Sequence, residues 1–147
     1  DERDAGRDVE AGDVVIGVDT SCSIDAKTLD MFFAEMAGLL EDVRPKRLVI
    51  IWCDAAVNRV DEAEEPSDLR VIRAKGAVGG GGTAFSPVFE EVTQMGITPD
   101  ALVYLTDGLG SFPSEPTYPV IWGSIYAKPD HYPFGDVVMV PKQAEKR

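Results

Sequence analysis

Short apolar runs rich in β-branched residues alternate with amphipathic stretches along the chain. Such runs are typical of strands that are buried in a sheet. They predict five strands, at residues 13–19, 47–54, 101–106, 120–125 and 136–140. A further segment, 56–60, follows the second run so closely that we expect it to return antiparallel beside it as a hairpin.

Two stretches have the periodicity of helices that cover a sheet. From Leu29 to Val43 the apolar residues recur at intervals of three and four, and Asp25 is placed to cap this helix. A second helix is predicted over residues 86–96, with Ser86 as its N-cap and Pro87 in its first turn. The order of strands and helices predicts an α/β fold with an open, mostly parallel, twisted sheet and an antiparallel edge hairpin.

Three other regions predict less regular structure. Six of the ten prolines follow residue 110, so we expect loops there and fewer helices in the C-terminal third. Residues 68–74 fit either one or two turns of helix or a short strand. The acidic run Asp61–Glu65 is expected to be a solvated edge, and Trp52 and Trp122 are expected to belong to the core.

The 147 residues suffice for one domain, and their charge is strongly unbalanced. The 26 acidic residues outnumber the 14 lysines and arginines, which gives a formal net charge of −12. This charge argues against nucleic-acid and anionic-membrane partners and suits a cation site or a basic partner. A single histidine excludes zinc sites built on several histidines.

No apolar run approaches the ~20 residues of a membrane span, and no signal peptide is visible, so we expect a cytoplasmic protein. In that compartment Cys22 and Cys53 are expected to be free thiols. The expected neighbouring strands can also bring these two cysteines close enough to pair.

Polar residues follow two of the predicted strands and a run of glycines. Residues 19–23 form a D-x-S-x-S pattern at the end of the first strand, Thr83 follows a run of four glycines, and Asp107 follows the strand 101–106. Ligands of open α/β sheets bind at the carboxyl ends of the strands, so we expect these side chains to converge. Hydroxyl and carboxylate oxygens suit a hard divalent cation such as Mg²⁺.

Taken singly, aspartates and serines in such places more often cap helices and fill turns, and only the ordered set indicates a metal site. The candidate metal ligands are Asp19, Ser21, Ser23, Thr83 and Asp107. Asp54, Gly82 and Gly108 are candidates for an outer shell of the same site, although the CDAA context of Asp54 favours a simple turn residue.

This ordered set resembles the metal-ion-dependent adhesion site of von Willebrand factor A (VWA) domains. The stretches VDTSCSID, VGGGGTAFSPVFE and ALVYLTDGLGSFP are further similar to the VWA-like C-terminal domain of predicted bacterial metallopeptidases. The resemblance implies a Rossmann-like VWA fold over residues 13–141, a linker or N-terminal arm over 1–12 and a tail over 142–147. The sequence departs from the pattern at Cys22, where a glycine is usual.

The resemblance implies a module that binds Mg²⁺, or Mn²⁺ or Ca²⁺, and through the metal an Asp or Glu of a partner protein. The peptidase-like histidine motif of that family lies in an upstream domain, so we do not expect this chain to be an enzyme. Implied partners are that upstream domain and, as a class, AAA+ ATPases. The alternative is a magnesium-dependent hydrolase or phosphatase with Asp19 as nucleophile. Ser21 stands where such phosphatases usually have a second aspartate, and Lys27 is the one lysine beside these motifs, which argues against this alternative.

Overall fold

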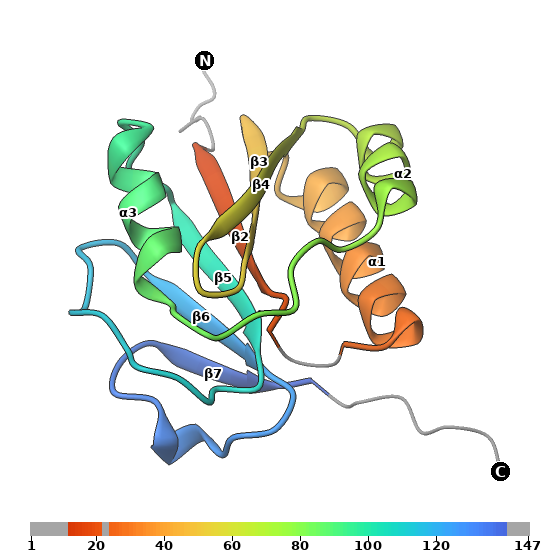
Figure 1. Cartoon of the computed structure of the whole chain (residues 1–147). Helices are drawn as coiled ribbons and strands as arrows, with labels where there is room; N and C mark the ends of the chain where they lie inside the picture. The colour runs from red at the N-terminus through yellow and green to blue at the C-terminus, as the bar shows by residue number, and fades with distance from the viewer. Residues whose placement is uncertain (1–11, 22–23, 141–147) are drawn as a thin grey trace, which may run out of the picture.

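A six-stranded sheet lies at the centre of the fold in the computed structural model, which describes residues 12–21 and 24–140 (Figure 1). The strand order is β4-β3-β2-β5-β6-β7, and every neighbouring pair is parallel except β3 and β4. The predicted open sheet with an antiparallel edge hairpin is therefore confirmed. The strands are β2 (Asp13–Asp19), β3 (Arg47–Cys53), β4 (Val57–Ala63), β5 (Ala101–Thr106), β6 (Val120–Ser124) and β7 (Asp136–Met139).

Helices cover both faces of the sheet, with α1 (Ala26–Asp42) and α2 (Pro66–Lys75) on one face and α3 (Ser86–Gln94) on the other (Figure 1). The Asp25 side chain caps α1 as predicted, since it accepts a hydrogen bond from the backbone N–H of Thr28 at 2.7 Å.

The other two helices differ in detail from the expectation. The ambiguous segment 68–74 is helical, because Pro66 starts α2 and the Asp68 carboxylate accepts the backbone N–H of Glu65 at 3.1 Å. Ser86 is already the first residue of α3, so the N-cap is Phe85 rather than the predicted Ser86. No helix in the described ranges is long and apolar enough to cross a membrane.

Helices are scarce in the C-terminal third, as the prolines predict. Among the described residues after β5, the single 3₁₀ turn Pro129–His131 is the only helical element. The 13-residue stretch 107–119 between β5 and β6 is a loop. The carboxyl edge of β5 and β6 is therefore bordered by loops that must be held by specific contacts.

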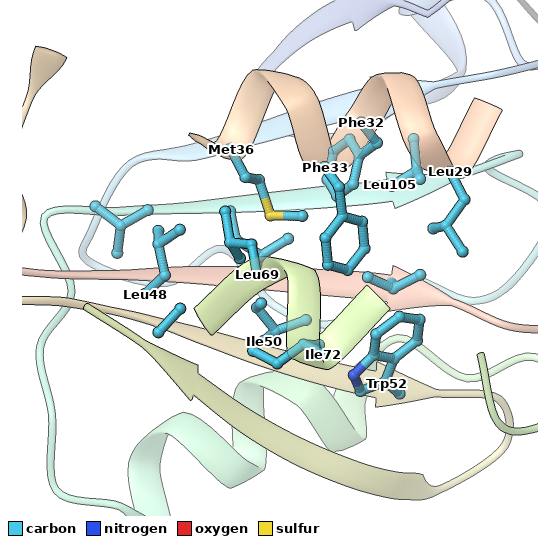
Figure 2. Close-up of a cluster of buried hydrophobic side chains, with 14 of the residues drawn as sticks. Leu29, Phe32, Phe33, Met36, Leu48, Ile50, Trp52, Leu69, Ile72 and Leu105 are labelled. Atoms are coloured by element: carbon cyan, nitrogen blue, oxygen red, sulfur yellow. The ribbon is translucent and has the colours of Figure 1, made fainter. Parts of the chain in front are cut away.

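Two apolar clusters fill the spaces between the helices and the sheet, because alternate residues of each strand point to opposite faces. Figure 2 shows the cluster under α1 and α2, and Trp52 and Trp122 are fully buried core residues as predicted. The labelled side chains of this cluster are Leu29, Phe32, Phe33 and Met36 of α1, Leu69 and Ile72 of α2, Leu48, Ile50 and Trp52 of β3, and Leu105 of β5.

The prediction of a solvated acidic edge is wrong for Asp61, which is only 7 % exposed. Strand β4 continues through this residue, and its carboxylate accepts hydrogen bonds from Trp52 Nε1 at 2.8 Å and Arg59 Nε at 2.7 Å. Lys75 Nζ, at the end of α2, donates a third at 3.0 Å. The acidic run thus contains one residue that joins β3, β4 and α2.

We predict that Asp61→Ala lowers the free energy of unfolding by about 2–4 kcal/mol at neutral pH, because three donors lose their acceptor. Burial raises the pKa of Asp61, but the hydrogen bonds from Arg59, Lys75 and Trp52 outweigh burial and hold this pKa below its usual value. The stabilisation is therefore complete above the unfolded-state pKa of about 3.9 and is lost as the pH falls below it.

Urea unfolding of the parent and of Asp61→Ala from pH 7 to pH 3 measures this effect. The matched control is Glu62→Ala, on the exposed side of the same strand. Arg47 Nη1 donates to Glu62 Oε1 at 3.2 Å, and the loss of this exposed pair should change the free energy of unfolding by less than about 1 kcal/mol. Equal losses of stability in the two variants, or a difference in stability that does not depend on pH, would contradict the role assigned to the Asp61 carboxylate.

Candidate metal centre

The carboxyl ends of β2, β3 and β5 meet at one edge, because β2 pairs in parallel with both of its neighbours. In the register of the sheet, Asp19 faces Cys53 and Val18 faces Leu105. Thr106, the next residue of β5, therefore lies level with Asp19. This edge is where ligands of open parallel sheets bind.

Asp19 is the centre of the polar group at this edge and is 1 % exposed. Its Oδ1 atom accepts hydrogen bonds from the backbone N–H of Ser21, at 3.0 Å, and from the Ser21 hydroxyl. The same hydroxyl is hydrogen-bonded to Thr83 Oγ1. The structure thus brings together three of the predicted ligands from β2, from the turn that follows it and from the glycine loop.

Thr106 is a member of this group that the sequence analysis missed. Its hydroxyl is fully buried, donates to Asp19 Oδ2 and accepts the backbone N–H of Gly108 at 3.0 Å. It therefore orients the carboxylate and also holds the start of the loop after β5. The signal in the sequence is a hydroxyl that closes an otherwise apolar strand one residue before Asp107.

Asp107 lies one residue beyond Thr106 at the same edge. Its Oδ1 atom accepts the backbone N–H of Leu109 at 2.9 Å, and its backbone oxygen accepts the N–H of Ala127 at 3.0 Å. Gly108 has φ +85°, and a Cβ there would lie 2.7 Å from Ala127 Cβ and would overlap the Tyr132 hydroxyl. This turn therefore requires the glycine, which sets the course of the chain beside Asp107.

Asp54 anchors the loop that carries Thr83. Its Oδ2 atom accepts the backbone N–H of Gly81 at 2.9 Å, and its backbone oxygen accepts that of Ala84 at 3.0 Å. The bond from Gly81, together with one from the N–H of Ala56, keeps the pKa of the Asp54 carboxyl below its usual value. Asp54 is thus a turn residue, as the sequence context favours, and it also fixes the backbone on both sides of Thr83.

Two glycines allow the loops at this edge to pack closely. Gly79 has φ +138°, and a Cβ there would overlap the Thr20 hydroxyl, while a Cβ on Gly110 would lie 2.9 Å from Thr83 Cγ2. A Cβ on Gly82, the glycine singled out from the sequence, would make only an ordinary contact at 3.9 Å. The close approach between the loops therefore depends on Gly79 and Gly110.

Cys53 lies directly under the Thr83 loop. Its thiol donates weak hydrogen bonds to the backbone oxygens of Asp54 at 3.3 Å and Ala84 at 3.4 Å. Burial raises its pKa to about 11, so the group is a neutral thiol at physiological pH. Cys22 and the predicted ligand Ser23 lie outside the described residues, so the expectation of two free thiols stays a prediction.

The oxygens gathered here are of the kind that a hard divalent cation prefers: one buried carboxylate and several hydroxyls. Among residues 12–21 and 24–140, no three His, Cys, Asp or Glu side chains gather as a metal cluster, which a hydroxyl-based site does not need. Asp19, Ser21 and Thr83 therefore fit Mg²⁺ or Mn²⁺ by their chemistry and by their convergence.

The fold and the site together define a class of protein. It is a Rossmann-like α/β domain whose candidate metal ligands lie at the carboxyl edge of a mostly parallel sheet. A model of the family described as "VWA-like domain (DUF2201)" matches residues 14–141. The chain belongs to this family. No curated protein matches the sequence.

The role of Thr106 can be tested by Thr106→Val, which keeps the shape and removes the hydroxyl. We predict a loss of about 1–3 kcal/mol in the free energy of unfolding, because Asp19 and the N–H of Gly108 each lose a partner in a buried place. Thr28→Val is the matched control, since that hydroxyl is equally buried and finds no hydrogen-bond partner among the described residues. Chemical denaturation of both variants measures the difference. A Thr106→Val protein as stable as Thr28→Val would refute the assigned role.

Proposed function

We propose that this VWA-like domain is a divalent-metal-dependent protein-interaction module that binds a carboxylate of a partner protein. The residues proposed to hold the metal are Asp19, Ser21, Ser23, Thr83 and Asp107. The observation that carries the proposal is the Ser21 hydroxyl, which is bonded to both the Asp19 carboxylate and the Thr83 hydroxyl. The family resemblance extends the proposal to a C-terminal domain of a longer, metallopeptidase-like protein.

The chemistry of the site explains why a metal would serve binding. Hydroxyl ligands are neutral, so a cation held largely by hydroxyls keeps much of its positive charge for an incoming acidic group. The whole chain has a formal charge of −12, which disfavours an acidic partner unless a positive charge is present locally. A bound cation supplies that charge.

The proposal is for a binding module rather than a hydrolase with Asp19 as its nucleophile. Asp19 is almost completely buried, and both of its oxygens accept hydrogen bonds, one from Ser21 and the other from Thr106. A nucleophile must be accessible to its substrate, and Asp19 is only 1 % exposed. A carboxylate held in this way is better suited to balancing the charge of a cation.

We predict that Mg²⁺ or Mn²⁺ stabilises the parent protein against heat, because a ligand that binds only the folded state adds to its stability. At about 100-fold over the dissociation constant the gain is about 2.7 kcal/mol, or roughly 5–10 °C in Tm for a domain of this size. Asp19→Asn keeps the shape of the side chain and removes its charge, and Thr83→Ala removes one hydroxyl. Both variants should lose most of this gain.

Thermal unfolding with and without metal, after treatment with EDTA, measures these shifts. Asp136→Asn is the control. Asp136 is an exposed aspartate at the start of β7, so it lies at the amino ends of the parallel strands, away from the candidate metal centre. It should respond to metal as the parent does. An unresponsive parent, or an Asp19→Asn protein that responds fully, would overturn the proposed site.

A further inference from the structure

Two large apolar side chains stand exposed beside Asp107. Leu109 is 51 % and Tyr126 is 68 % exposed. The backbone N–H of Leu109 is bonded to the Asp107 carboxylate. Tyr126 lies between Ile125 and Ala127, whose N–H groups bond to the backbone oxygens of Thr106 and Asp107 at 2.9 and 3.0 Å. Both side chains therefore border the candidate metal centre.

Hydrogen bonds and close packing hold the backbone that carries Leu109 and Tyr126. Gly108 packs against Ala127 and Tyr132, and its backbone oxygen is hydrogen-bonded to His131 Nε2 at 2.7 Å. The buried Tyr132 hydroxyl in turn donates to Ser124 Oγ at 2.8 Å. A surface whose backbone is already ordered loses less freedom when a partner covers it.

The glycine loop beside the site, residues 76–85, contains no charged side chain, and the anionic Asp54 anchors it through the N–H of Gly81. The charged residues of the loop 107–119 are Asp107 and Glu115. Lys128, which is exposed, follows Tyr126 by two residues, and the exposed Asp130 follows Lys128 by two more. Because salt screens charges beyond about 8 Å at physiological ionic strength, the uncharged glycine loop separates an arriving carboxylate from part of the acidic surface.

We propose that Leu109 and Tyr126 form an apolar subsite that recognises residues flanking the acidic residue of the partner. The partner is then a protein segment in which Asp or Glu stands between apolar side chains, rather than a generally acidic segment. This inference rests on the proposed function, because the metal-bound carboxylate places the flanking residues. Exposed apolar patches that are rimmed by polar groups are common at protein-interaction sites.

Three synthetic nonapeptides, identical except at their centres, test the subsite by NMR titration of the ¹⁵N-labelled protein. Their centres are Leu-Asp-Leu, Ser-Asp-Ser and Leu-Asn-Leu, and each is measured in Mg²⁺ and in EDTA. In Mg²⁺ we expect the Leu-Asp-Leu peptide to bind about five- to tenfold more tightly than the Ser-Asp-Ser peptide, since its apolar side chains leave water.

Leu109→Ser and Tyr126→Ser should each reduce this preference to within about twofold. Val71→Ser is the matched control, because Val71 is 62 % exposed but lies on α2, and it should keep the full preference. Equal affinity of the Leu-Asp-Leu and Ser-Asp-Ser peptides overturns the subsite, as does a preference that survives both loop variants. Failure of the Leu-Asp-Leu peptide to bind at millimolar concentration in Mg²⁺ also overturns it.

The same titrations separate this inference from the proposed function. Binding that needs both Mg²⁺ and the central aspartate supports the metal site even when the flanking residues have no effect. Leu-Asp-Leu and Leu-Asn-Leu peptides that bind equally well, in EDTA as in Mg²⁺, would contradict the metal-dependent function itself.

Discussion

The parallel pairing of β2 with β3 and β5 is the constraint on which the rest of the candidate site depends. It places Asp19 level with Thr106 and directs the chain after each strand to the same edge of the sheet. From there the Ser21 hydroxyl needs only a short turn to contact both Asp19 and Thr83. A shift of one residue in the β2–β5 pairing would turn Asp19 or Thr106 to the opposite face and separate their oxygens.

The loops at this edge are held by hydrogen bonds from their backbone N–H groups to Asp54 and Thr106. Asp54 binds the glycine loop on both sides of Thr83, and Thr106 holds the loop after β5 through the N–H of Gly108. The close fit at Gly79 and Gly110 brings the loops near enough to share one centre. This support explains how the domain positions a polar site although its C-terminal third has few helices in the described residues.

Local patterns predicted much of the fold and indicated the candidate site residues, of which Asp19, Ser21 and Thr83 lie together in the structure. Contacts that depend on register or tertiary packing were not predictable. The D-x-S-x-S turn, Thr83 and Asp107 are visible because each directly follows a recognisable strand or glycine run. Thr106 was missed because its role appears only when β5 lies beside β2. Asp61 was assigned to the solvated surface because its partners Trp52 and Lys75 come from a neighbouring strand and a helix that the sequence left undecided.

The central claim is that oxygens from three loops form one cation site at the carboxyl edge of the sheet. The most direct test is the broadening of amide signals by substoichiometric Mn²⁺ in ¹⁵N-labelled protein. The account predicts that the amides of Ser21, Thr83 and Gly108 broaden first and together. Broadening that is strongest over the acidic run Asp61–Glu65, or that leaves those three amides sharp, would contradict it.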